Sequence, residues 1–558
     1  MSVVVGDVQA GSAGTGLLPF RLRGWRWFAL AVAAVVLAPL LVTAVSWLQI
    51  DAQIWEHLRA TLLGRLVTNT VLLVLGVGTL VLVLGVSLAW LTAVCDFPGR
   101  RWFDWALMLP LAVPAYVLAF TLIGIFDYSG PVQSQIRDVF GTSAWFPPIR
   151  STGGVILVMS LVLYPYVYML ARTAFLAQGV GLMEAARLNG LGPWRAFFRV
   201  ALPMARPAIA AGTALALMEA LADFGAVAVF NYDTFTTAIY RVWFGFFSLE
   251  TAAQLASLLL LFVALAVFAE RYSRGRARFY QRSVPGNQLR IRLSGWRGAL
   301  ATGACGLVLA FAFVIPLIQL LWWVAGHSLA DFNAQYFGML GRTVALGAMA
   351  AAITVTLALL LAYARRAQPD WLTRRAVGVS TLGYAMPGSV LAVAVMLVFT
   401  RVDGWLAGVL NEPGGQWLTG TVIALLLAYS IRFMAVAFNS VDSAFEQVRP
   451  SMAEAARSLG AGQGEVIRRV FVPMLRPGLF AGALLVCVDV MKEMPATLLL
   501  RPYGWDTLAV RIYEFTSDGE WQRAALPAVT LILVGLLPVI LLVRRSVAQR
   551  RQLSAQPG

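Results

Sequence analysis

The feature that most constrains the fold of this chain is a series of apolar runs, each long enough to cross a bilayer. A membrane-spanning helix needs about 20 mostly apolar residues, and twelve such runs occur along the 558 residues. They fall near 27–48, 67–94, 105–126, 154–176, 208–230, 252–269, 298–324, 343–364, 377–400, 418–440, 478–500 and 525–543. The sequence therefore predicts an all-α polytopic membrane protein with no large soluble domain.

Composition supports this prediction. Only 13% of the residues are charged and 59% are hydrophobic, whereas soluble proteins carry about 25% charged residues. The first apolar run follows Arg21, Arg23 and Arg26, as in a signal peptide, but it is long and has no clear small-x-small cleavage site. We expect an uncleaved first span with a cytoplasmic N-terminus.

Arginine placement predicts the orientation of the twelve spans, because cytoplasmic loops are enriched in basic residues. With the N-terminus inside, the cytoplasmic segments hold 30 arginines and 10 acids, and the outer loops hold 10 arginines and 13 acids. Both termini are therefore predicted to be cytoplasmic. Since the arginines follow topology and form no single patch, nucleic-acid binding is disfavoured. The expected divisions are a tail at 1–26, a transmembrane domain at 27–269, a basic linker at 270–297, a second transmembrane domain at 298–543 and a tail at 544–558.

Several kinds of catalytic or cofactor site are excluded by the residues present. Lys492 is the only lysine and follows Met491, so the chain has no GxxxxGK[ST] phosphate-binding loop, and any ATP must be hydrolysed by another subunit. The cysteines and histidines stand far apart, at Cys95, Cys305, Cys487, His57 and His327. Their spacing suits neither a disulfide framework nor a zinc site. No Ser/His/Asp, Cys/His or HExxH arrangement appears, so we expect no enzyme and no cofactor bound by this chain.

Two segments predicted to be cytoplasmic match each other without a gap. They are EAARLNGLGPWRAFFRVALPMARP at 184–207 and EAARSLGAGQGEVIRRVFVPMLRP at 454–477, offset by 270 residues. The identical residues include Glu184 and Glu454, Ala185 and Ala455, Ala186 and Ala456, Gly190 and Gly460, and Pro203 and Pro473. The offset continues to Gly212 and Gly482, and earlier in the halves Thr70 matches Thr343 and Pro114 matches Pro387 at an offset of 273. Nearly the whole chain is therefore a duplicated unit.

Each copy is predicted to form a short helix, a turn and a second amphipathic helix. Glu184 and Glu454 favour a helix start through the macrodipole, and Gly190 and Gly460 can supply a left-handed turn at the helix end. Two such helices suit a partner with twofold or pseudo-twofold symmetry. The alternative, a pair of amphipathic loops lying on lipid headgroups, would not require a gap-free repeat of glycine and proline.

This repeat resembles the EAA signature of binding-protein-dependent ABC importer permeases. Two copies on twelve spans resemble a fused, two-half permease of the bacterial inner membrane, over about residues 60–270 and 335–545. The resemblance implies that each EAA segment is a coupling helix docking on one of two ATPase subunits, and that an extracytoplasmic binding protein delivers the substrate. The coupling residues implied are Glu184, Ala185, Ala186, Gly190, Pro203, Glu454, Ala455, Ala456, Gly460 and Pro473. Val472 departs from the pattern, because a leucine usually precedes the proline.

Two further stretches resemble ferric-iron permeases within this class, namely residues 222–247 and 491–514. The second contains MKEMPATLLLRP, in which a leucine is commoner at the position of Met494. The resemblance implies ferric iron as the substrate. Fused permeases for thiamine and other solutes look broadly similar, so another small solute stays open as an alternative.

Four acids lie within the predicted spans, as two pairs that are equivalent through the 270-residue offset. Glu219 and Asp223 form one i,i+4 pair and Asp489 and Glu493 the other, so each pair shares a helix face. Acids inside spans usually face a cavity or a partner, and hard cations prefer oxygen ligands. The acids are thus candidates to line the translocation pathway. Alternatively, Lys492 neutralises Asp489 or Glu493 and the acids pair structurally between the halves.

The remaining intramembrane residues have simpler expected roles. Tyr232, Tyr240 and Tyr513 are predicted to add oxygens near the outer mouth of the pathway. Arg172 and Arg432 are predicted to snorkel at cytoplasmic span ends. An ion-coupled secondary transporter is the competing functional class, since such proteins also contain internal repeats; the EAA pair is the feature that separates the two.

Overall fold

The computed structural model describes residues 24–178, 188, 190–274, 290–328, 331–412, 414–446 and 448–554. The helices of the first half are α1 (Gly24–Val45), α2 (Ala52–Thr61), α3 (Leu63–Val94), α4 (Arg100–Ala106), α5 (Ala115–Phe126), α6 (Pro131–Phe140), α7 (Thr152–Ala177), α9 (Pro193–Ala196), α10 (Leu202–Ala222), α11 (Gly225–Val229), α12 (Phe235–Phe246) and α13 (Leu249–Arg274). Those of the second half are α14 (Trp296–Leu309), α15 (Ile315–Trp323), α16 (Ala334–Ala367), α17 (Trp371–Ser380), α18 (Gly388–Leu410), α19 (Val422–Phe445), α20 (Pro450–Ser458), α21 (Gln463–Val466), α22 (Val472–Lys492), α23 (Pro495–Leu500), α24 (Leu508–Ser517) and α25 (Ala525–Ser554).

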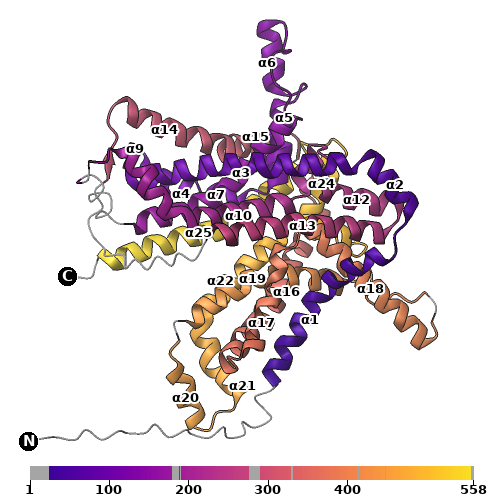
Figure 1. The fold of residues 1–558 in the computed structure, drawn as a ribbon. Coiled ribbons are helices and arrows are strands. Elements are labelled where there is room, and N and C mark those ends of the chain that lie inside the picture. The colour runs from indigo at the N-terminus through magenta and orange to yellow at the C-terminus, as the bar shows by residue number, and fades with distance from the viewer. Residues whose placement is uncertain are drawn as a thin grey trace, which may run out of the picture.

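The predicted all-α polytopic architecture is confirmed. Among the described residues, eleven helical segments are long and apolar enough to cross a membrane. The twelfth predicted run, 525–543, begins α25, where the apolar stretch Ala525–Ile540 is shorter than the others. In the ribbon, α3, α7, α10 and α13 run side by side, and α16, α19 and α22 form a second bundle (Figure 1).

Four predicted spans are not continuous helices, which corrects the sequence prediction for 105–126, 208–230, 377–400 and 478–500. In the first and third, short turns of 3₁₀ helix at η3 (Leu109–Ala112) and η8 (Leu382–Ala385) precede α5 and α18. Pro114 and Pro387 stand at these breaks with extended backbones, at ψ 142° in both. Proline lacks an N–H and cannot continue the preceding helix.

The other two breaks are equivalent through the 270-residue offset. Helix α10 ends at Ala222 and α11 begins at Gly225, while α22 ends at Lys492 and α23 begins at Pro495. The backbone turns at Asp223 and Glu493, which have extended ψ values of 129° and 114°. Both breaks lie inside segments that the apolar composition alone would have continued across the membrane.

The first helix of each half packs against the other half. Helix α1 lies along α16, α17 and α18, α14 lies against α4, and α15 lies against α5 (Figure 1). The two apolar cores are therefore mixed. One contains residues of α3 and α7 together with Ala301, Cys305 and Leu320, and the other contains residues of α16 and α19 together with Ala29 and Val36.

A short parallel strand pair ties the end of the predicted linker to the first half. Strand β1 (Cys95–Asp96) follows α3 and pairs with β2 (Ile291–Arg292), with Cys95 opposite Ile291. The backbone N–H of Leu293 extends the pairing to the carbonyl oxygen of Asp96 (2.9 Å). Residues 275–289 of the linker lie outside the described residues.

Gly212 and Gly482 provide a matched test of the packing in the two halves. A Cβ at Gly212 would lie 2.8 Å from Val167 Cα on α7, whereas a Cβ at Gly482 would meet Ser440 Cβ on α19 at 3.3 Å. We expect Gly212→Ala to cost about 1–3 kcal/mol through overpacking. Gly482→Ala should be close to neutral, because the gain in helix propensity offsets a milder contact. Thermal unfolding of both variants in detergent checks this, and equal losses would contradict it.

Candidate translocation pathway and coupling segments

The four intramembrane acids lie at the two equivalent helix breaks or one turn before them. Asp223 follows the last residue of α10, and its Oδ1 accepts from the backbone N–H of Ala226 (2.8 Å). Glu493 occupies the same position after α22, and its Oε1 accepts from the N–H of Ala496 (3.2 Å). Each acid therefore satisfies a backbone donor exposed by the break. Glu219 and Asp489 lie one turn earlier, on α10 and α22.

The four acids line one cavity shared by both halves, with a volume of about 190 Å³. The basic residues Lys492 and Arg432 and the hydroxyl-bearing Tyr116, Tyr166 and Tyr384 line the same cavity. We call this space the carboxylate cavity. Among the described residues, no group of three or more His, Cys, Asp or Glu side chains converges closely enough to hold a metal ion. The cavity concentrates charge but does not form a preorganised metal centre.

Arg432 is buried and paired, which corrects the prediction that it snorkels. Its Nε lies 3.2 Å from Glu493 Oε2, and its Nη1 donates to the carbonyl oxygen of Met386 (3.1 Å). The side chains of Arg432 and Glu493 are only 11% and 6% exposed. Gly388 leaves room for the pair, because a Cβ there would collide with Glu493 Oε1. The partner of Glu493 is thus Arg432.

Polar contacts at the carboxylate cavity also cross between the halves. Tyr384, from the second half, donates to Glu219 Oε1 of the first half (2.9 Å). Lys492 Nζ donates to the carbonyl oxygen of Leu111 (3.3 Å), and Tyr116 Oη donates to the carbonyl oxygen of Lys492 (3.4 Å). The ammonium attracts Asp489, one turn earlier on α22. The acids therefore line a cavity, and Glu493 and Glu219 have polar partners there.

The tyrosines predicted for the outer mouth do not line the carboxylate cavity. Tyr240 and Tyr513 pack around Phe224, with ring centroids 5.3 and 5.5 Å from it. Phe224 lines the cavity, so the three rings lie on its α12 and α24 side. Tyr232 is remote from this cluster and donates to the carbonyl oxygen of Asn69 on α3 (3.3 Å).

Sequence reasoning missed the three tyrosines that do line the cavity, and the repeat offers no signal for them. At the offset of 270, Tyr166 corresponds to Val436. At the offset of 273 that relates Pro114 to Pro387, Tyr116 corresponds to Ser389 and Tyr384 to Leu111. Each tyrosine is therefore present in only one half.

Arg172 is also buried and paired instead of snorkelling. Its Nη2 lies 2.5 Å from Asp104 Oδ1, and its Nε donates to the same oxygen (2.6 Å). This pair joins α7 to α4 within the first half. The prediction failed because an arginine near a span end has the same sequence signature whether it reaches headgroups or an internal carboxylate.

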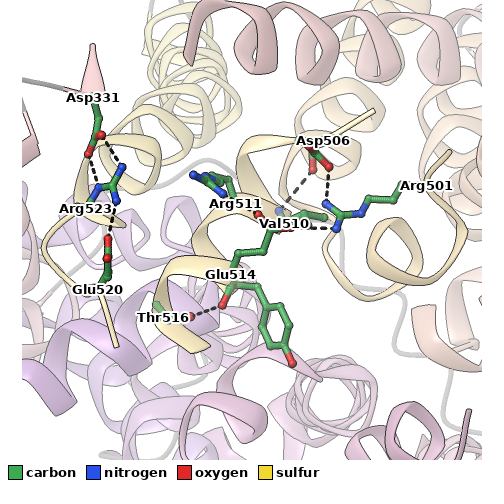
Figure 2. Close-up of polar contacts among 11 residues, drawn as sticks. Asp331, Arg501, Asp506, Val510, Arg511, Glu514, Thr516, Glu520 and Arg523 are labelled. Carbon is green, nitrogen blue, oxygen red and sulfur yellow. Dashed lines mark hydrogen bonds and ion pairs between the residues drawn. The ribbon is translucent and has the colours of Figure 1, made fainter. Parts of the chain in front are cut away.

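An ion-pair network fixes the segment that carries Tyr513. Arg501 contacts Asp506 (2.6 Å) and Glu514 (2.9 Å), and Arg511 also contacts Glu514 (3.1 Å). Figure 2 shows these contacts next to a second group. In that group, Arg523 binds Asp331 (2.8 Å) and Glu520 (2.7 Å), and these hydrogen bonds raise the pKa of Arg523 above its usual value. The network holds the loops around α24 in place.

The second EAA segment is helical and accessible. Helix α20 contains Glu454, Ala455 and Ala456; Glu454 and Ala455 are exposed and Ala456 is partly exposed. Gly460 follows with φ 87°, the left-handed conformation expected from the sequence. Pro473 lies in the first turn of α22. A binding partner can therefore reach the start of this segment.

The first EAA segment is described only in part. Glu184, Ala185 and Ala186 lie outside the described residues. Gly190 has φ 75°, matching Gly460, and Pro203 lies in the first turn of α10, as Pro473 does in α22. A π-helical turn precedes each of these helices, at Phe197–Ala201 and Ile467–Phe471. The duplication is thus preserved in backbone detail.

The start of α1 contacts the second EAA segment. Trp25 Nε1 donates to Gln463 Oε1 on α21 (2.9 Å). Arg26 pairs with Asp370 (3.2 Å), the residue that caps α17 by accepting from the N–H of Thr373 (2.9 Å). Burial alone would raise the pKa of Asp370, but the hydrogen bonds from Thr373 and Arg26 outweigh it and lower that pKa. Helix α1 therefore links the first half to the second EAA segment.

Two membrane-embedded repeats with broken helices around one shared cavity define a transport permease. The family described as binding-protein-dependent transport system inner membrane component matches residues 81–278 and 354–514. The chain belongs to this family and is a multi-pass membrane protein.

Individual relatives cover either the whole fused architecture or a part of it. The Fe(3+)-transport system permease protein of Haemophilus influenzae is 28% identical over 486 residues, covering 86% of this chain and 90% of the relative. A putative ferric transport system permease protein of the same species is 24% identical over 84% of this chain and 74% of the relative. The molybdenum transport system permease protein ModB of Escherichia coli is 35% identical over 146 residues, covering 26% of this chain and 62% of the relative.

The Arg432–Glu493 pair gives a stability prediction. We expect Arg432→Met to destabilise the protein by about 3–5 kcal/mol, because it leaves a buried carboxylate without its partner. The double variant Arg432→Met/Glu493→Gln should recover most of that loss. Arg401→Met, at an exposed residue, is the control and should change stability by less than about 0.5 kcal/mol. Unfolding in detergent measures all three, and equal losses in the single and double variants would refute the pairing.

Proposed function

We propose that this chain forms the translocation pathway of an ATP-driven, binding-protein-dependent importer of ferric iron. The observation that carries the proposal is the carboxylate cavity. Each half contributes two acids to it, at or next to equivalent helix breaks. The acids in it outnumber the bases by two, so the cavity favours a cation over an anion. Two relatives that match most of the chain are named as ferric or Fe(3+) permeases, which supports the same cargo.

The proposed mechanism is alternating access driven by two copies of a separate ATPase. An extracytoplasmic binding protein delivers the cargo to the outer loops. Closure of the ATPase dimer brings the two EAA segments together, and the halves rock between inward-open and outward-open states. Both termini and both EAA segments lie on the cytoplasmic side in this proposal. The arginine asymmetry supports the orientation, and the helical, accessible α20 supports the docking.

Residues of this chain have separate roles in that cycle. Glu219, Asp223, Asp489 and Glu493 provide oxygens for a hard cation in transit. Phe224, Tyr240 and Tyr513 cover the cavity on one side. The helix breaks leave backbone groups that bond to cavity acids, an arrangement tolerated at membrane depth only where protein or a water-filled cavity surrounds it. The chain itself makes no covalent intermediate.

Cargo is tested by reconstitution with the cognate ATPase and binding protein. We expect ATP-dependent uptake of ferric iron, and uptake should fall at least about tenfold when all four cavity acids are neutralised. The variants are Glu219→Gln, Asp223→Asn, Asp489→Asn and Glu493→Gln. Co-purification of the ATPase with the neutralised variant is the control, and it should stay near the unmodified level.

Two outcomes would overturn these assignments separately. Robust uptake of thiamine or another solute without ferric uptake would reject the cargo and keep the importer class. Unchanged ferric uptake by the cavity variant, with the ATPase still assembled, would reject the acids as part of the pathway.

Coupling to the ATPase is tested at two glycines of the second EAA segment. Gly460 has φ 87°, whereas Gly462 has φ −70°, which alanine adopts readily. Gly460→Ala should strain the turn by about 1–2 kcal/mol and reduce co-purification of the ATPase several-fold. Gly462→Ala should have little effect. If both variants retained the ATPase equally, the left-handed turn would have no role in docking.

A further inference from the structure

The carboxylate cavity is symmetric in its acids but not in its bases. Glu219 corresponds to Asp489 and Asp223 to Glu493 at the 270-residue offset. Both basic residues come from the second half. The residue equivalent to Lys492 is Ala222, and the residue equivalent to Arg432 is Val162. Since Ala222 and Val162 also line the cavity, the duplicated scaffold tolerates a neutral side chain at both positions.

The two basic side chains are held differently. Arg432 is fixed by Glu493 and by the Met386 carbonyl oxygen. Among the described residues, the Lys492 ammonium makes one long hydrogen bond, to the carbonyl oxygen of Leu111 at 3.3 Å. It lies against α25, where a Cβ at Gly535 would be 2.6 Å from Nζ. Lys492 thus places a positive charge at the seam between the halves without closing an ion pair there.

A transport pathway must bind its cargo strongly enough for entry and weakly enough for release. The excess negative charge of the cavity attracts a trivalent cation, because Coulomb attraction scales with the product of the charges. A tethered ammonium in the same cavity opposes that attraction.

We propose that Lys492 tunes the affinity of the carboxylate cavity: its ammonium weakens cation binding there, so that the cargo can leave. The inference rests on the proposed function only in taking the cavity as part of a cation pathway. Lys492 acts through space on the cavity and need not touch the cargo. Its charge sets the balance between cargo affinity and the rate of release.

The test uses terbium(III), a hard trivalent cation whose luminescence is sensitised by nearby aromatic rings such as Tyr116, Tyr166 and Tyr384. It is titrated into the detergent-purified permease bound to its ATPase. Lys492→Met should bind terbium at least about tenfold more tightly than the unmodified protein. Lys492→Arg, which keeps the charge, should stay within about threefold. The four-acid neutral variant should lose the cavity signal.

The pseudo-symmetry provides a sharper control. Lys492→Ala/Ala222→Lys moves the ammonium to the equivalent position in the first half and should restore weak binding. Arg401→Met removes an exposed charge and should leave the affinity unchanged. If Lys492→Met bound terbium as the unmodified protein does, or if the relocated lysine failed to restore weak binding, the proposal would be wrong.

Transport kinetics separate this role from a structural one. Lys492→Met should lower both KM and kcat for the cation, because tighter binding slows release, whereas damage to the fold would lower kcat without lowering KM. Failure of the proposed function gives a different result. The reconstituted transporter would then take up no ferric iron, while the order of terbium affinities among the Lys492 variants stayed as expected. Ferric uptake with unchanged KM in Lys492→Met would reject the role of Lys492 and keep the function.

Discussion

The structure depends on two helix breaks inside the membrane. In lipid, each unpaired backbone group costs several kcal/mol, so irregular backbone is tolerated only where protein or water surrounds it. Here Asp223 and Glu493 accept hydrogen bonds from the N–H groups of Ala226 and Ala496. Because these acids serve the backbone, they are drawn into the protein interior, and the packing of the two halves around them creates the carboxylate cavity. The same two acids therefore satisfy the backbone at the breaks and line the cavity.

The exchange of first helices explains how the halves stay associated around a polar interior. Helix α1 packs on the second half and α14 on the first, so each apolar core includes residues from both. Van der Waals packing is a main source of helix association in a membrane, and this exchange spreads it over both halves. The contact of Trp25 with Gln463 extends the connection to the second EAA segment. Because α1 and α14 each pack on the opposite half, movement of one half would also move a helix of the other.

Duplication gives the two halves a nearly symmetric framework. Residues that occur in only one half make the carboxylate cavity asymmetric. The glycines of the EAA turns and the π-helical turns recur in both halves. The bases and tyrosines of the cavity do not, since Lys492, Arg432 and Tyr384 come from the second half and Tyr116 and Tyr166 from the first. The cavity therefore has an asymmetric set of side chains within a nearly symmetric scaffold.

The sequence by itself determined the membrane class, the approximate spans, the duplication and the four acids as a set, because hydropathy and repeat spacing are local properties of the chain. It could not locate the breaks at Asp223 and Glu493, since the flanking residues are apolar enough to continue a helix. It also could not assign partners to Arg172 and Arg432, which required knowing that Asp104 and Glu493 lie beside them. Which tyrosines reach the cavity was decided only by tertiary packing, because contacts between residues far apart in the chain leave no periodic signal in the sequence.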